Sequence, residues 1–284
     1  SEEGRLDQLR WMDHWLKGKD TGILDEPPVK LEIRTGGSEK PYPFRTENEW
    51  PIARTQWTKA YLRIDREQGH DEMATEGELV SEPPRSVGKL SYPASGVTRA
   101  GVASGSSLST THGGAGRLGV SFQSEPMPEA REITGPLVMN LWVSSTTEDM
   151  DIFVTLRNLG ADGKEVYEVG QHGQPVPLTK GWLRASHRKL DPARSLPYRP
   201  YHPHNERLWL NPGEPVECQI EIWPTAIVLG QGHRLRVDIQ PRDGVGSAPY
   251  THYHADYNAG ALNTIYSGGD KQSYLLLPII PAKQ

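Results

Sequence analysis

Several short groups of residues in this chain resemble parts of the catalytic machinery of hydrolases. Ser186 and His187 place a hydroxyl beside an imidazole, the two groups that a nucleophilic hydrolase combines. Gly105-Ser106-Ser107-Leu108-Ser109 approaches the G-x-S-x-G nucleophile elbow, and His112-Gly113-Gly114-Ala115-Gly116 imitates a lipase oxyanion motif. Each group has a plainer structural interpretation, which the surrounding sequence must decide.

Ser186 and His187 lie in a stretch, Gly181 to Arg188, that has the pattern of a strand. Successive side chains on a strand point to opposite faces, so these two residues cannot form a Ser–His pair with each other. We expect Ser186 to share a face with Arg184 and Arg188, and His187 to lie on the other face. Packing and interface hydrogen bonds are the predicted roles.

The serine-rich and glycine-rich groups lack the context that catalysis needs. The stretch 105–109 has no second glycine and lies in a polar loop, whereas an elbow follows a strand. Without an elbow, the stretch 112–116 is better interpreted as a flexible turn, because backbone N–H groups stabilise an oxyanion only beside a nucleophile. We therefore expect no catalytic residue in this chain.

His252 and His254 are the best candidate metal ligands, since residues i and i+2 of a strand face the same side. With Asp256 nearby, the group allows a cupin-like metalloenzyme as an alternative. Loop-forming residues surround it, however, and no glutamate follows at the expected position. His202 and His204, in a proline-flanked segment, are weaker candidates. We expect no metal and no cofactor.

Three aspartates, Asp149, Asp151 and Asp162, could contribute oxygen ligands to a calcium site. Aspartate also begins turns, and turn residues flank all three positions. The favoured interpretation is that they are solvated loop ends.

The eight tryptophans leave a binding function open. Trp142, Trp182, Trp209 and Trp223 fall on or near predicted strands, where exposed rings could stack on sugars. Aromatic rings are equally common in cores and in domain contacts. A stand-alone carbohydrate-binding module is therefore an alternative to a structural role.

Composition limits the class of protein. A formal charge of −5 and a pI near 6.1 give no electrostatic reason to expect nucleic acid or an anionic membrane as partner. The single cysteine, Cys218, excludes an intrachain disulfide and is predicted to be a small buried hydrophobe. No apolar run approaches the roughly 20 residues that cross a bilayer. The compartment stays open, with the cytoplasm favoured.

Helical periodicity marks the start of the chain. Leu6, Leu9, Met12 and Leu16 recur at helical spacing, and two tryptophans form an adjacent stripe, so residues 3–17 are predicted to be an amphipathic helix. Its apolar stripe needs a large surface to pack on. That surface is either the chain's own sheet or a domain that precedes it.

Beyond residue 27 the period changes to two. The 29 glycines and 24 prolines favour many short strands with turns. Residues 65–116 are polar, with only short strand-like pieces, and are interpreted as an excursion or linker. From residue 117, strands without intervening helices predict a jelly-roll antiparallel β-sandwich, each strand wetted on one face. The clearest strands contain Val120, Leu137–Val143, Ile152–Leu156, Val216–Ile222 and Leu235–Ile239.

Four blocks, in this order, resemble one enzyme group. They are Leu9–Gly18 followed by Pro27-Pro28-Val29, then Gly181–Arg188, Gly232–Val237 and Ser273–Pro281. Together they resemble the C-terminal β-domain of the CocE/NonD and X-Pro dipeptidyl-peptidase group of serine hydrolases. In that group the Ser, Asp and His lie upstream, in an α/β-hydrolase domain.

The resemblance implies three segments. Residues 1–26 would be the helix and linker from the end of an α/β-hydrolase domain. Residues 27–116 would carry the first strands and the excursion, and residues 117–284 the main jelly-roll body. The implied function is an accessory region that packs on the catalytic domain and shapes the substrate cleft of an acyl esterase or X-Pro dipeptidyl peptidase. Its partner would be that domain in the same polypeptide, and a homo-oligomer is allowed.

Overall fold

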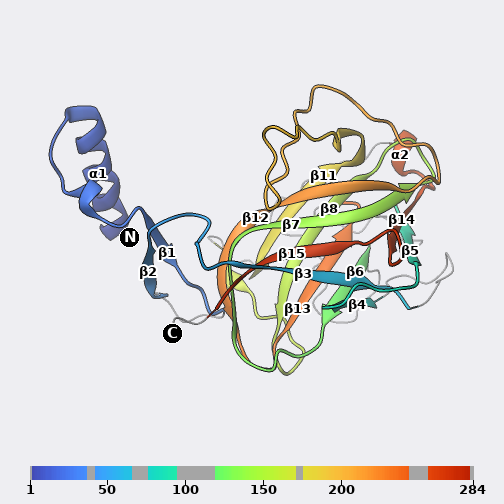
Figure 1. Cartoon of the computed structure of the whole chain (residues 1–284), viewed down its shortest axis with the longest axis horizontal. Coiled ribbons are helices and arrows are strands. Elements are labelled where there is room, and N and C mark those ends of the chain that lie inside the picture. The colour runs from blue at the N-terminus through green and yellow to red at the C-terminus, as the bar shows by residue number, and fades with distance from the viewer. Residues whose placement is uncertain are drawn as a thin grey trace.

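A computed structural model describes residues 2–36, 42–65, 76–94, 119–170, 175–242 and 255–281. It consists of a β-body and an arm that projects from one end of it (Figure 1). The arm begins with helix α1 (Glu2–Lys17), followed by a short 3₁₀ turn and the hairpin of β1 (Val29–Glu32) and β2 (Phe44–Glu47). Among the described residues, no helix is long and apolar enough to cross a membrane.

Helix α1 forms where the sequence predicts it, one residue longer at its start. Glu2 and Glu3 lie in its first turn and His14 and Lys17 in its last, which suits the helix dipole at both ends. Gly18 adopts φ 63° and its N–H bonds the His14 carbonyl, a left-handed cap that ends the helix.

Thirteen further strands make up the body and its edge. They are β3 (Gln56–Arg63), β4 (Glu76–Val80), β5 (Gly88–Pro93), β6 (Val120–Ser124), β7 (Arg131–Ser145), β8 (Asp151–Leu159), β9 (Glu168–Val169), β10 (Pro175–Val176), β11 (Thr179–Arg184), β12 (Val216–Leu229), β13 (Arg234–Gln240), β14 (Leu262–Ser267) and β15 (Tyr274–Ile280). A four-residue helix, α2 (Ala255–Asn258), precedes β14.

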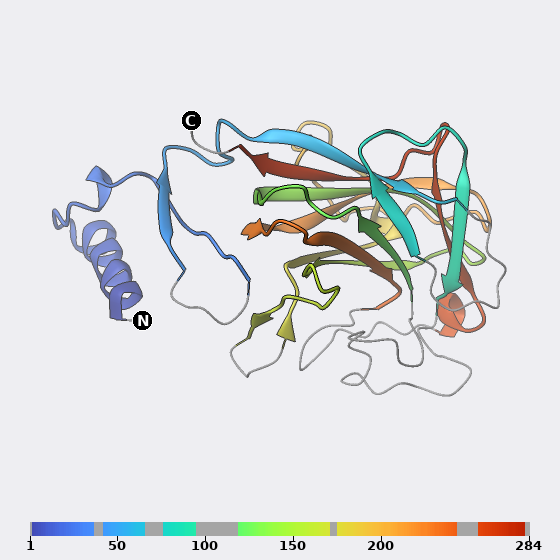
Figure 2. The ribbon, with the colours of Figure 1, turned by 90° about the horizontal axis from the view of Figure 1, so that it is seen from below.

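The strands of the body close on themselves. Their order is β12-β11-β8-β13-β6-β4-β3-β15-β7, and β7 pairs again with β12, so that the ring of hydrogen bonds is complete. Strands β14 and β5 continue the sheet beyond the end of β7. Figure 2 shows the two sides of this body lying over each other, with the arm beyond one end. The prediction of a mainly β fold is confirmed.

Two short strands of the region 65–116, β4 and β5, join the sheets of the body where the structure describes it. Strand β4 pairs with β3 on one side and, in parallel, with β6 on the other, and β5 pairs with β14. The early strands and those after residue 117 therefore share one sheet. The polar composition concealed β4, whose sequence EGELV has little alternation.

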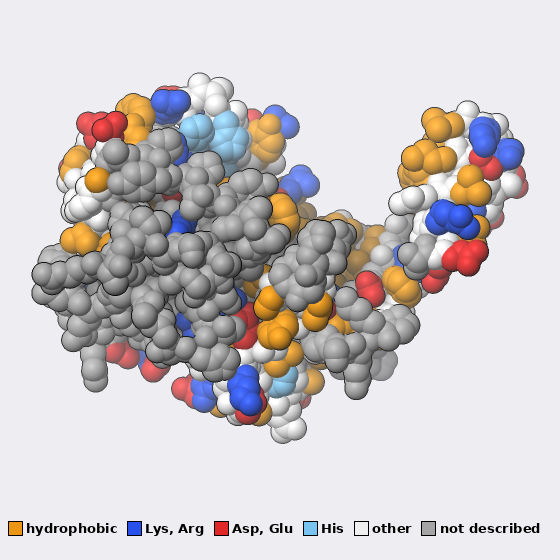
Figure 3. All heavy atoms as spheres, turned by 180° about the vertical axis from the view of Figure 1, so that it is seen from behind, with side chains coloured by type: hydrophobic (Ala, Val, Ile, Leu, Met, Phe, Trp, Pro, Cys, Tyr) orange, Lys and Arg blue, Asp and Glu red, His pale blue; other side chains and the backbone are white. Residues whose placement is uncertain are grey.

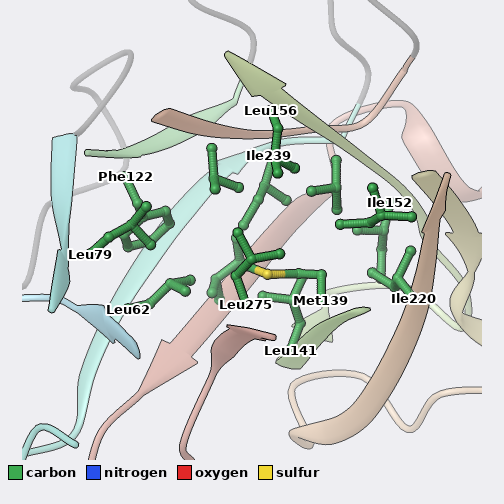
Figure 4. Packing of buried hydrophobic residues seen from close by; sticks show 14 of the residues in the cluster. Leu62, Leu79, Phe122, Met139, Leu141, Ile152, Leu156, Ile220, Ile239 and Leu275 are labelled. Atoms are coloured by element: carbon green, nitrogen blue, oxygen red, sulfur yellow. The ribbon is translucent and has the colours of Figure 1, made fainter. Parts of the chain in front are cut away.

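Apolar side chains from both sides of the ring fill its interior. Figure 4 shows Leu62 and Phe122 at one end of this cluster, Ile152 and Ile220 at the other, and Met139 between them. All five are essentially inaccessible to solvent. Each buried side chain of this size contributes about 1.5–3 kcal/mol to folding by leaving water, so this interior is the main source of stability.

The prediction that each strand has one wetted face is wrong for β8 and β13. Every described residue of β8 is buried, and in β13 only the first is not. The charges there pair internally: Arg157 Nε donates to Asp238 Oδ2 over 2.7 Å, and Arg236 Nε donates to Asp238 Oδ1 over 2.7 Å. Burial disfavours a charged carboxylate, but these two guanidinium groups outweigh it and hold the pKa of Asp238 below its usual range.

Candidate functional site

Helix α1 presents its polar side to its own chain and its apolar side to solvent. Glu3 and Asp7 pair with Lys30 of β1, and Arg10 pairs with Glu26. The opposite side carries exposed apolar residues, and no residue of the helix is buried. They are Leu6, Leu9, Trp11, Met12, Trp15 and Leu16, between 48 and 76 % exposed.

This arrangement is the reverse of an ordinary surface helix, whose apolar stripe faces the core. Figure 3 shows hydrophobic atoms along one side of the arm, separated from the body. Of the two surfaces proposed from the sequence, the chain's own sheet is therefore excluded for the described residues. A contiguous exposed apolar patch of this kind marks an interaction site.

Partly buried polar contacts anchor the hairpin that carries α1 to the body. The Arg45 guanidinium donates to both carboxylate oxygens of Glu132 on β7, over 2.7 and 2.5 Å. Arg34 donates to the carbonyls of Ala226 and Leu178, each over 3.3 Å. The base of the arm is thus fixed on the body, and it holds α1 in place through ion pairs.

Exposed tryptophans recur on the body. Of the eight in the sequence, seven are exposed, and only Trp142 is half-buried. Trp57 stacks on Tyr198 with ring centroids 4.8 Å apart. Trp182 and Trp223 meet nearly edge to face, with centroids 5.3 Å apart. Tryptophan is the residue type most enriched at binding hot spots.

A bulge in β12 turns Trp223 outward. The register between β12 and β7 shifts between Ile222 and Thr225, so Trp223 and Pro224 leave the ladder. Pro224 has no N–H to donate there, which makes a bulge the expected outcome at this position. Trp223 is 58 % exposed as a result.

Two cavities open on either side of Trp223. The first, about 620 Å³, lies between the base of the arm and the body, where Leu31, Trp50 and Pro224 line it. The second, about 540 Å³, has Trp182 and Glu221 in its wall, with three histidines described below. Trp223 lines both cavities, and we call the area around the two the Trp223 surface.

Ser186 and His187 do not form a catalytic pair. Strand β11 ends at Arg184, and residues 185–187 form a 3₁₀ turn, so the alternation predicted through Arg188 is wrong there. Ser186 is buried and its Oγ donates to Asp149 Oδ2 over 2.7 Å. The N–H and the hydroxyl of Ser186 thus both bond Asp149, which holds the turn.

The three aspartates lie in different settings. Asp149 and Asp151 are buried, which corrects their interpretation as solvated loop ends. Asp151 accepts two hydrogen bonds from Arg184, over 2.8 and 2.9 Å. Only Asp162 is an exposed turn residue, bonded by the Lys164 N–H. Within the described residues, no three His, Cys, Asp or Glu side chains are placed to hold a metal ion.

Of the remaining candidate residues from the sequence, the structure describes Cys218 and Asp256. Cys218 is buried, and burial raises the pKa of its thiol to about 12, so the prediction of an inert hydrophobe is confirmed. Asp256 lies exposed in α2. The stretches 105–109 and 112–116, and His252 with His254, lie outside the described residues.

The fold is a mainly β body with a closed ring of strands, and exposed aromatic residues lie on its surface. Residues 21–276 match the profile of the X-Pro dipeptidyl-peptidase C-terminal non-catalytic domain, and the chain belongs to that family. The match begins after α1.

The chain is similar to longer hydrolases over most of its length. It is 30% identical over 249 residues to a protein of Mycobacterium bovis described as a candidate serine esterase, covering 83% of this chain and 35% of that protein. It is 23% identical over 297 residues to the cocaine esterase of Rhodococcus sp. strain MB1 Bresler, covering 95% and 45%. A CocE/NonD family hydrolase from Staphylococcus aureus superposes on 99% of this chain and 46% of its own, with a TM-score of 0.77 and 24% identity.

The chain therefore spans less than half the length of these relatives. The superposition on the staphylococcal hydrolase covers nearly the whole chain, which shows that the fold recurs within a larger protein.

Proposed function

We propose that this chain is the C-terminal accessory region of a serine hydrolase of acyl esterase or X-Pro dipeptidyl-peptidase type. It packs on the α/β-hydrolase domain of the same polypeptide and helps to shape the substrate cleft. Residues 1–26 are the helix and linker that end that domain. The catalytic Ser, Asp and His lie upstream of this chain, where they would attack an ester or amide carbonyl through an acyl-enzyme.

The observation that carries this proposal is the reversed helix α1. The six apolar residues on one side of the helix are 48 to 76 % exposed, while its polar side is paired with the arm. The Trp223 surface is a second exposed area that a neighbouring domain could cover. We interpret the closed ring of strands behind it as a jelly-roll sandwich, with the arm side turned to the catalytic domain.

The experiment joins two separately expressed parts: this chain and the segment encoded upstream of Ser1. We expect the chain alone to show no ester turnover, and the two parts to form a complex measurable by analytical ultracentrifugation. Trp15→Ser should weaken the complex at least about tenfold, as loss of an aromatic hot spot does. Trp209→Ser, an exposed tryptophan against Tyr257 on the body, is the matched control.

Phosphonate-sensitive turnover by the pure chain would contradict the proposal. So would an upstream sequence that lacks a G-x-S-x-G elbow followed by Asp and His.

A stand-alone carbohydrate-binding module is the second candidate. The observation that favours it is the Trp182–Trp223 pair beside the exposed carboxylate of Glu221, which joins stacking surfaces to a hydroxyl acceptor. Glycan-array binding lost on Trp223→Ala would support it, and an array without binding would exclude it.

Partners and location complete the proposal. A homo-oligomer is allowed, and neither nucleic acid nor membrane is an expected partner. The cytoplasm remains the favoured compartment, which fractionation of the source cells would test.

A further inference from the structure

Three histidines meet at the mouth of the second cavity. His187 ends the 3₁₀ turn after β11, and His202 and His204 come from the loop of residues 188–215. The His187 and His204 ring centroids are 5.1 Å apart, and those of His202 and His204 are 6.0 Å apart. Figure 3 shows histidine side chains gathered at one edge of the body.

His187 and His204 touch through their ring nitrogens. Their two Nδ1 atoms are 2.9 Å apart. One nitrogen must donate and the other accept, so the contact cannot form between two doubly protonated rings. Burial and the neighbouring His187 and His202 lower the pKa of His204, in agreement with a ring that is neutral when the contact is made.

The backbone around this contact is constrained. His204 has φ 52°, the only positive φ of a residue other than glycine within the described ranges. Such conformations persist where the surroundings enforce them. Four residues on, the Leu208 N–H donates to the Ser186 carbonyl over 2.7 Å, which ties the same segment to the 3₁₀ turn.

His202 differs from His204 in that both of its ring nitrogens lie against hydrogen-bond acceptors. Its Nδ1 lies 3.1 Å from the Lys189 carbonyl oxygen and its Nε2 lies 2.8 Å from that of Gln219. Carbonyl oxygens only accept, so both contacts are hydrogen bonds only when both ring nitrogens carry protons. Acid therefore does not break this anchor of the loop.

Most of the other charged side chains near the cluster are paired. Arg184 is bonded to Asp151, Lys189 to Glu206, and Arg188 to backbone carbonyls, while Glu221 lies across the cavity. Imidazole is the side-chain type whose charge ordinarily changes between about pH 5 and 8.

We propose that the His187–His204 contact is a pH-sensitive latch that closes the segment 203–208 onto the 3₁₀ turn and opens on acidification. His202 keeps the rest of the loop in place, so the opening is local and changes one wall of the Trp223 surface. That the change would loosen the contact with a catalytic domain rests on the function proposed above. The latch itself is a property of this chain alone.

The test is amide exchange of Leu208 in the full chain, measured by NMR as a protection factor so that intrinsic exchange is removed. Between about pH 7.5 and about pH 5, we expect its protection to fall roughly five- to tenfold, the effect of losing one hydrogen bond. His204→Asn, which suits the left-handed backbone, should have low protection that no longer changes with pH. His233→Asn, which removes a histidine bonded to Asn158, should behave as the parent chain does.

Constant protection of Leu208 in the parent chain would overturn the latch. The same fall in His204→Asn would also overturn it, because the pH response would then come from another group. Neither result bears on the docking of α1, which the two-part complex at neutral pH tests separately.

Discussion

The arm and the body of this chain place apolar and charged side chains in opposite positions. The body encloses its apolar residues and even buries an aspartate between two arginines, whereas α1 exposes its apolar side and turns its charges inward to the arm. A domain that folds alone follows the first pattern. The second pattern is that of a surface that another domain completes. The body thus buries its own apolar residues, and we propose that another domain covers those of the arm.

The largest effect should come from the buried charges of the body. Asp238→Asn leaves Arg157 and Arg236 without their shared carboxylate, and breaking a buried pair costs about 3–5 kcal/mol. Urea unfolding measures the loss. A loss below about 1 kcal/mol would mean that the network is solvated.

Asp238 should also make the stability of the folded chain depend on pH in the acid range. Its pKa is lower in the folded chain than in the unfolded one, so its stabilisation is present above about pH 4 and is lost as the pH falls through the folded value. Urea midpoints of the parent chain should therefore fall in acid more steeply than those of Asp238→Asn. Parallel curves would contradict the assignment.

Apolar packing in the body gives the next effect. Leu137, fully buried on β7, should lose about 2–5 kcal/mol on substitution by Ala. Leu16→Ala, at a 76 % exposed position on α1, is the matched control and should stay within about 0.5 kcal/mol. Equal costs at both sites would remove the distinction between arm and body.

Breaking the contacts between the arm and the body should cost less stability than a core substitution and more than a surface substitution. Arg34→Met removes the hydrogen bonds to Ala226 and Leu178, with an expected cost of about 1.5–3 kcal/mol for bonds from a charged group. Arg85→Met, at an exposed position, should cost almost nothing in the same unfolding experiment. An unchanged midpoint for Arg34→Met would show that the arm does not depend on this joint.

The sequence predicted those features that depend on local periodicity. The helix at 3–17 and the strands around Leu137, Ile152, Val216 and Leu235 all lie where the pattern placed them. It could not predict that β8 and β13 are buried on both faces. Charged residues such as Arg236 and Asp238 are predicted to face solvent, and the partner that allows their burial, Arg157, lies about 80 positions away in the sequence. Charge pairing between strands does not change the alternation of apolar and polar residues along one strand, so it cannot be predicted from that alternation.

The candidate site was predictable only in part. The apolar stripe of α1 was evident, but which side faces the chain depends on ion pairs with Lys30 and Glu26, formed only when the hairpin folds back. The His187–His204 contact joins residues from a turn and an irregular loop, for which no periodic signal exists. A bulge at Trp223 could be suspected from Pro224 within a strand pattern.

The central claim is that another domain covers the exposed side of α1. Hydroxyl-radical footprinting of Trp11 and Trp15 tests it most directly, by comparing this chain alone with the same chain joined to the segment encoded upstream. We expect both rings to be oxidised readily in the chain alone and to be protected in the joined protein, while Trp209 reacts equally in both. Equal oxidation of Trp11 and Trp15 in the two samples would contradict it.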